Sequence, residues 1–358
     1  MSRSGRANRA DLVFEGGGVK GIGLAGAFSV LAEQGWEAMN IAGTSAGAIT
    51  AALVAAGYTA EELKEEVLEL DFNRFQDKGW EDKIPVFEKT FSLLKDLGLY
   101  EGTFFQSWMA ERLAAKGKRT FGDLVVNPDE KELRYRYRLQ VVASDVTQRR
   151  LLVLPRDAAS LGIEPDELEI AYAVRMSMSM PVFFEPVQHV NPETNRVHLI
   201  VDGGMLSNFP VWLFDSPAGE EPAWPTFGLL LVEGNHKASV AERLPEPERA
   251  RRGAGGLVAF VKALAQTTME FHDRLYVEKA DFARTIPIET LGVRTTEFDL
   301  PRERALALYD SGRKAAEAFL ADWDFEAYIA KFRSGRARAG RRTEIASELQ
   351  AEADSVHH

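Results

Sequence analysis

The chain has 358 residues, a formal net charge of −11 at pH 7 and 45% hydrophobic residues, a composition typical of a globular protein with a large core. The acidic balance argues against nucleic acid as the main partner, and the absence of cysteine excludes disulfides and thiolate metal sites. Residues 1–10 are basic without an apolar run, and the longest apolar stretch, residues 21–32, is too short to span a bilayer. We therefore expect a cytoplasmic protein, free or peripheral at a membrane.

The first predicted strand, residues 11–15, runs into three consecutive glycines and then an apolar helix over residues 22–32. Backbone N–H groups in such a glycine loop can point at an anion, and the helix N-terminus adds its positive dipole end. In acyl transfer the anion is the tetrahedral oxyanion. The loop therefore predicts an oxyanion hole, with these candidate residues: Gly16, Gly17, Gly18, Val19 and Lys20.

The same loop matches G-x-G-x-x-G, a pattern also found in dinucleotide-binding folds. That function needs an acidic residue about 20 positions on, at the end of a second strand. Glu37 lies near this distance, but it precedes the apolar run of residues 39–42 instead of ending it. The nucleotide interpretation is therefore disfavoured.

The second predicted strand, residues 39–42, ends in the pentapeptide Gly43-Thr-Ser-Ala-Gly47, which a small-residue helix over residues 48–56 follows. A G-x-S-x-G sequence between a strand and a helix is the pattern of a nucleophile elbow, whose sharp turn exposes the serine Oγ. Ser45 is thus the candidate nucleophile, the alternative being an ordinary tight turn.

Residues 60–120 are helix-like and rich in aromatic side chains. They either pack these aromatics inward as a helical subdomain or form an interfacial lid over Ser45. The aromatic residues are Phe72, Phe75, Trp80, Phe87, Phe91, Phe104, Phe105 and Trp108.

Residues 134–142 and 151–154 are predicted to be paired strands, and Asp145 between them is interpreted as a turn residue rather than a catalytic carboxylate. Ser177 and Ser179 are interpreted as helix or loop serines, because no elbow surrounds them. The nearby apolar side chains are core residues or candidates for lining an acyl pocket: Met176, Met178, Met180, Phe183 and Phe184.

A hairpin of residues 181–190 and 196–201 leads into Asp202-Gly-Gly, which places a carboxylate at the end of a strand. Asp202 is the candidate general base, the alternative being a turn residue at the end of the strand. Burial beside apolar neighbours is expected to raise its pKa. His198 lies four strand residues away, roughly 13 Å, too far for a relay. His189, on the facing arm of the hairpin, is interpreted as a surface or edge residue. A Ser–Asp dyad is therefore favoured over a histidine base.

Residues 226–232 predict a further sheet strand, residues 233–256 a polar loop, and residues 257–280 and 302–332 helices. The arginine-rich run from Arg333 to Arg342 is either a solvated tail or a contact for anionic lipid. We expect residues 1–333 to form one catalytic domain, with residues 60–120 as its helical insertion or lid, and residues 334–358 to form a basic, flexible C-terminal tail.

In order and spacing, three elements resemble the patatin-like phospholipases: the glycine loop, the Ser45 elbow and Asp202-Gly-Gly. The resemblance extends to residues 143–147, 173–184 and 208–210, and covers about residues 10–212. Lys20 departs from the family, which more often has arginine there. The resemblance implies a three-layer α/β/α fold with a mostly parallel central sheet and a helical insertion.

The resemblance also implies an acyl hydrolase with a Ser–Asp dyad that acts on phospholipids or lysophospholipids without a metal or other cofactor. Nothing in the sequence predicts the oligomeric state. Two alternatives stay open. An acyl-serine can pass its acyl group to an alcohol, as in an acyltransferase, and the fold can serve as a lipid-binding module without turnover.

Overall fold

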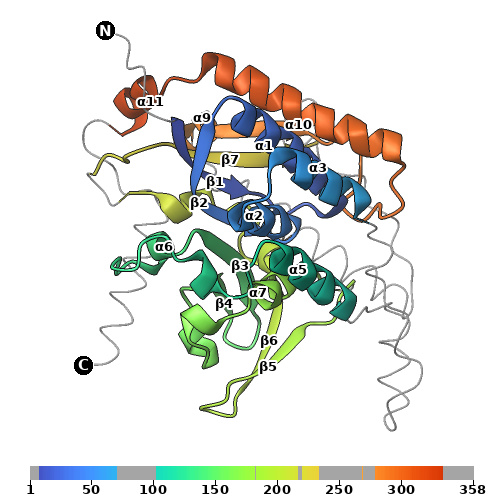
Figure 1. Cartoon of the computed structure of the whole chain (residues 1–358), viewed down its shortest axis with the longest axis vertical. Helices are drawn as coiled ribbons and strands as arrows, with labels where there is room; N and C mark the ends of the chain where they lie inside the picture. Colours follow the sequence, from blue (N-terminus) through green and yellow to red (C-terminus); the bar gives the residue numbers. More distant parts are fainter. Residues whose placement is uncertain are drawn as a thin grey trace.

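The computed structural model describes residues 8–70, 102–181, 183–216, 220–233, 268 and 279–333. Within these ranges the strands form a single mixed sheet, in the order β5-β6-β3-β2-β1-β7-β8 with β4 paired to β3 (Figure 1). The strands are β1 Asn8–Phe14, β2 Trp36–Thr44, β3 Leu139–Asp145, β4 Arg150–Leu154, β5 Val187–Val190, β6 Val197–Asp202, β7 Thr226–Val232 and β8 Thr285–Glu289. From β3 through β2, β1 and β7 to β8 all neighbours are parallel, while β4, β5 and β6 join antiparallel.

Helices flank this sheet, so the predicted mostly parallel α/β architecture is confirmed. The helices are α1 Ile22–Glu33, α2 Ala46–Ala56, α3 Ala60–Glu69, α5 Thr103–Ala115, α6 Leu133–Arg136, α7 Ile170–Ser177, α9 Lys279–Ala283, α10 Arg302–Asp322 and α11 Phe325–Phe332. Leu12 and Phe14 of β1 point into the core shared with α1, α2 and α7, whereas Val13 points to the opposite face. Among the described residues, that opposite face packs against the segment 209–214.

The backbones of helices α1 and α10 pack very close together, and Figure 1 shows α10 lying along α1. A Cβ atom on Gly26 would lie 1.9 Å from the carbonyl oxygen of Tyr309, and one on Gly312 would lie 1.9 Å from that of Gly23. Glycine is therefore required here for the close backbone approach, which fixes α10 over the first βα unit.

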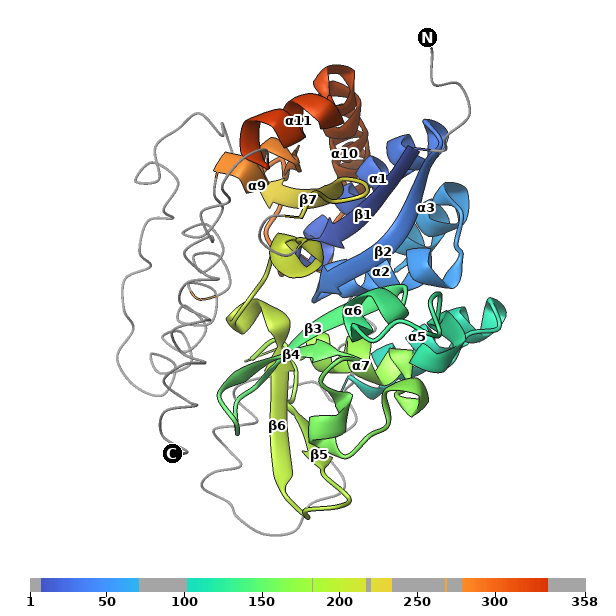
Figure 2. The same ribbon diagram turned by 90° about the vertical axis from the view of Figure 1, so that its left-hand side faces the viewer.

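The strand β3 brings two distant chain segments end to end. On one edge, its residues 141–145 pair with β4. On the other edge, its first half pairs with β2 as far as Thr44↔Val142, and its second half pairs with β6 from Ala143↔Asp202. The ends of β2 and β6 thus meet at adjacent positions of β3, with β2 arriving from the upper half of Figure 2 and β6 from the lower half.

The predicted strand at residues 226–232 and the hairpin that leads into Asp202 are confirmed. Two other predictions were inaccurate, and one strand was missed. The strand expected from residue 134 begins at Leu139, after the short helix α6. The helix expected over residues 302–332 is two helices, because Asp324 caps the N-terminus of α11 by accepting the amide of Ala327 at 3.0 Å. Strand β8 was not predicted.

The expected helical insertion is described only in part. The helix α5 packs against α7 and α2, with Phe105 and Met109 buried in the core. Residues 71–101 lie outside the described residues, so the choice between subdomain and lid stays a prediction. All but the first residue of the loop expected at 233–256, most of the helix at 257–280 and the basic tail at 334–358 also lie outside them. In the ranges described, no helix is long and apolar enough to cross a membrane.

Candidate active site

Ser45 lies on a sharp turn between β2 and α2, with φ 53° and ψ −127°. Positive φ is uncommon for a residue with a side chain, and such strain is frequent at functional sites. The flanking glycines are required by sterics: a Cβ on Gly43 would lie 2.4 Å from the carbonyl oxygen of Gly47, and one on Gly47 would lie 2.3 Å from that of Phe14. The local geometry is therefore that of a nucleophile elbow.

Asp202, the last residue of β6, lies beside this turn. The Ser45 hydroxyl donates a hydrogen bond to Asp202 Oδ2 at 2.7 Å, and Asp202 Oδ1 accepts the amide of Gly204 at 2.8 Å. Both side chains are buried. The register of β2 and β6 along β3 brings the two residues together although 157 positions separate them in sequence.

Burial dominates the electrostatics of the carboxyl group. It raises the pKa of Asp202 from 3.8 to about 7, against the opposing effect of the hydrogen bonds from Ser45 and Gly204. The direction is the one expected from the sequence. A carboxylate with a pKa near neutrality is a much better proton acceptor than an exposed one, so the pair has the properties needed for general-base activation of a hydroxyl.

The glycine loop lies against the same turn, since a Cβ on Gly16 would come within 3.1 Å of Ser45 Cβ. Three of its five candidate amides already have backbone acceptors. The amide of Gly16 donates to Asn208 O at 3.1 Å, that of Val19 to Thr295 O at 3.2 Å, and that of Lys20 to Gly17 O at 3.2 Å.

The amides of Gly17 and Gly18 remain as candidate oxyanion donors, because they have no acceptor within the described part of the chain. Gly18 has φ 55°, a conformation that glycine adopts without strain. The buried Lys20 side chain places Nζ 3.2 Å from Glu233 Oε1, so its charge is paired with a carboxylate.

One candidate for the acyl pocket contacts the nucleophile: Met178 Sδ lies 3.8 Å from Ser45 Oγ. Met176, Met180 and Phe184 are buried in the same hydrophobic core as Met178. Phe183 is partly buried and packs edge-on against Phe298, with ring centroids 6.1 Å apart. For all five residues, Met178 included, an acyl-lining role stays a prediction.

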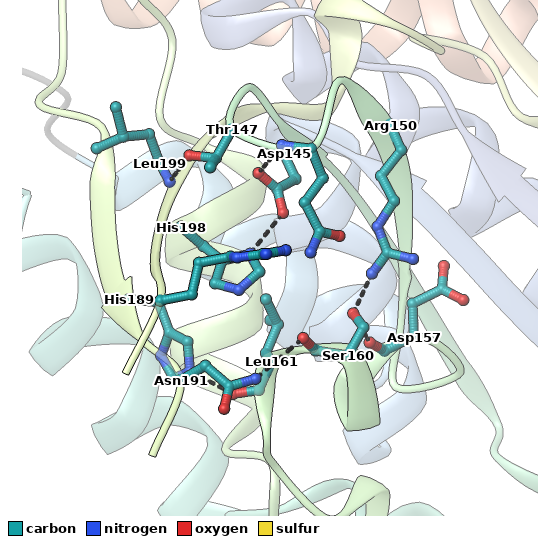
Figure 3. Close-up of polar contacts among 12 residues, drawn as sticks. Asp145, Thr147, Arg150, Asp157, Ser160, Leu161, His189, Asn191, His198 and Leu199 are labelled. Carbon is teal, nitrogen blue, oxygen red and sulfur yellow. Dashed lines mark hydrogen bonds and ion pairs between the residues drawn. The ribbon is translucent and has the colours of Figure 1, made fainter. Parts of the chain in front are cut away.

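Asp145 and the nearby histidines form a separate cluster (Figure 3). His198 Nδ1 lies 2.7 Å from Asp145 Oδ2, and both side chains are buried. The other oxygen of Asp145 accepts the amide of Gln148 at 3.0 Å, in agreement with the turn role predicted for it. His189 lies on the edge strand β5, half-buried, with Nε2 2.8 Å from the carbonyl oxygen of Leu161. Among the described residues, no histidine hydrogen-bonds to Ser45 or Asp202.

A metal site is not indicated by the described ranges, which contain no group of three or more His, Asp or Glu side chains placed to hold an ion.

Comparison with known proteins assigns the chain to a family. The family model described as patatin-like phospholipase matches residues 12–215, which include the glycine loop, the elbow and Asp202. The chain belongs to the patatin-like phospholipase family. Membership of this family supports lipid hydrolase activity.

The chain is 38% identical over 315 residues to the uncharacterized protein YqhO of Bacillus subtilis, covering 88% of this chain and 99% of that protein. It is 24% identical over 240 residues to the uncharacterized protein R571 of Acanthamoeba polyphaga mimivirus, covering 66% of this chain and 70% of that protein. The crystal structure of VipD from Legionella pneumophila superimposes with a TM-score of 0.51 at 19% identity, covering 88% of this chain and 67% of that one. At this identity the similarity shows the fold alone.

Three residues that contact this patatin-like site were not selected as site residues from the sequence. Asn208 and Thr295 accept amides of the glycine loop through their carbonyl oxygens, and Ser177 accepts the amide of Ser45 through its hydroxyl. Asn208 belongs to a segment that resembles the family, so its position carried a signal. Ser177 also belongs to such a segment, residues 173–184, although nothing local to it indicates a bond to Ser45. Thr295 acts through a contact between distant parts of the chain, and no local pattern marks it.

Proposed function

We propose that this protein hydrolyses carboxylic esters of phospholipids or lysophospholipids through an acyl-Ser45 intermediate, with Asp202 as the general base. The observation that carries the proposal is the 2.7 Å hydrogen bond from Ser45 Oγ to a buried carboxylate whose pKa is raised to about 7. Family membership supports the lipid substrate class.

In the first half-reaction, Ser45 Oγ attacks the ester carbonyl carbon while Asp202 accepts the hydroxyl proton. The negative charge that develops on the carbonyl oxygen is stabilised by the amides of Gly17 and Gly18, the two loop amides with no acceptor within the described part of the chain. The C–O bond to the alcohol then breaks, and the alkoxide leaves with the proton held by Asp202.

In the second half-reaction, water gives its proton to Asp202 and attacks the acyl-Ser45 ester. The bond to Ser45 Oγ breaks, the serine recovers its proton and the fatty acid is released. The apolar Met178 beside Ser45 favours an acyl chain over a polar substituent at this position.

Fatty-acid release from phosphatidylcholine and lysophosphatidylcholine vesicles tests the proposal. Ser45→Ala is expected to reduce release by about 10³-fold or more, because the proposed acyl intermediate forms on Ser45 Oγ. The melting temperature of the variant should stay near that of the wild type, since a small side chain replaces a small one. Equal release by both proteins, or no release by the wild type from either lipid, would contradict the proposal.

A further inference from the structure

The C-terminal end of α7 contacts both members of the Ser–Asp pair. The hydroxyl of Ser177 accepts the backbone amide of Ser45 at 2.8 Å and donates to the carbonyl oxygen of Val142 in β3 at 2.6 Å. Two residues on, the carbonyl oxygen of Ser179 accepts the backbone amide of Asp202 at 2.9 Å. Ser177 is fully buried, so water does not compete for these bonds.

The bond to the Ser45 amide has a specific consequence because the elbow is strained. With φ 53°, Ser45 adopts a backbone conformation that persists only where the surroundings hold it. The Ser177 hydroxyl supplies such a restraint and connects the elbow to β3, the strand along which β2 and β6 meet. The direction of Ser45 Oγ toward Asp202 therefore depends on a side chain 132 positions away in sequence.

The same bond affects how the oxyanion is stabilised. In the serine proteases of the trypsin type, the backbone amide of the nucleophile is itself one of the oxyanion donors. Here the amide of Ser45 is already bonded to Ser177, so it is not available to the oxyanion. The oxyanion must then be stabilised by other amides, among which are those of Gly17 and Gly18 in the glycine loop.

We propose that Ser177 is a positioning residue: its hydroxyl holds the strained Ser45 turn so that Oγ faces Asp202 and the Ser45 amide stays turned away from the substrate. The segment from Ser177 to Ser179 thereby fixes the nucleophile and the base relative to each other. This inference rests on the proposed function of Ser45.

The test compares Ser177→Ala with Ser29→Ala. Ser29 is a matched control: it is also buried in a helix, its hydroxyl donates to the carbonyl oxygen of Gly26 at 2.7 Å, and it accepts a bond from Arg313 at 2.7 Å. Each variant is measured for kcat and KM on a water-soluble ester, for the rate of covalent labelling of Ser45 by a fluorophosphonate, and for melting temperature.

Ser177→Ala is expected to lower kcat and the labelling rate together, by about 10- to 100-fold, because small displacements of a reacting atom have effects of this size. The KM should stay within about twofold, since Ser177 does not touch the substrate. Ser29→Ala should lower the melting temperature without changing either rate. Unchanged rates in Ser177→Ala, or equal falls in both variants, would overturn the proposal.

Ser177→Cys provides a second variant should Ser177→Ala fail to fold. Its side chain fills nearly the same volume, but sulfur is a weak acceptor, so a folded protein with slower labelling is expected. A labelling rate of Ser45 in Ser177→Cys equal to that of the wild type would overturn the positioning role. The labelling assay also separates the two proposals: a wild type that is labelled at Ser45 yet releases no fatty acid contradicts only the proposed lipid hydrolysis.

Discussion

Replacing Asp202 by asparagine is expected to abolish activity and to change how stability depends on pH. The pKa of this carboxyl group is raised from 3.8 to about 7 by burial, a shift of about three units. Each unit corresponds to about 1.4 kcal/mol, so the ionised carboxylate lowers the free energy of unfolding by about 4 kcal/mol above pH 7.

The sign follows from the protons that each state binds. Between about pH 4 and pH 7 the unfolded chain has lost the Asp202 proton while the folded protein retains it. The unfolded state therefore binds fewer protons, and the contribution of this group makes the protein less stable as the pH rises through this range. The asparagine side chain of the Asp202→Asn variant would carry no charge at any of these pH values and would remove the effect.

Asparagine also brings a penalty. Its carbonyl oxygen can still accept the amide of Gly204, but its second amide hydrogen is left without an acceptor, which costs about 1–3 kcal/mol when buried. This penalty does not vary with pH, so the difference between two pH values isolates the charge. Between pH 5 and pH 8 the wild type should lose about 2–3 kcal/mol more stability than Asp202→Asn.

The assay is urea denaturation of both proteins at pH 5 and pH 8, with fatty-acid release measured in parallel. Parallel pH dependence of the two unfolding free energies would refute the reasoning, because it would mean that the carboxyl group has an ordinary pKa in the folded protein. An active Asp202→Asn variant would refute its role as the base.

The same pKa predicts that kcat of the wild type on a water-soluble ester falls about tenfold per pH unit below pH 7 and levels off above it, since only the ionised carboxylate accepts the serine proton. A pH–rate profile flat from pH 5 to pH 8 would contradict this. In the core, Gly312→Ala should destabilise the protein by about 1–3 kcal/mol, because the added Cβ would lie 1.9 Å from the carbonyl oxygen of Gly23 and force α10 away from α1. Urea denaturation measures the loss, and Ala318→Gly, a change at an exposed position of the same helix, controls for altered helix propensity.

The amino-acid sequence by itself determined the local parts of the site. A strand that runs into three glycines, and a second strand that runs into Gly43-Thr-Ser-Ala-Gly47, specify turns that only glycine-flanked chains can form. The carboxylate of Asp202 could also be recognised from the sequence, because it ends an apolar strand just before two glycines. These features depend on neighbouring residues, and the strand-to-helix periodicity around them predicts the α/β class.

Tertiary structure decided how these parts work together. The distance of 2.7 Å between Ser45 and Asp202 results from the register of β2 and β6 along one edge of β3, and strand register is a property of the whole sheet. The pKa of Asp202 results from burial by segments far away in sequence.

The supporting bonds were likewise invisible in the sequence. Ser177 lies in a segment that resembles the family, but nothing in that segment predicts its bond to the amide of Ser45. Thr295 accepts the amide of Val19 from a loop that follows β8, outside the region that the family model matches. A hydrogen bond between residues more than 100 positions apart leaves no periodicity or spacing that a single sequence can reveal. The sequence therefore predicts the reacting groups, and only the folded chain shows what holds them in position.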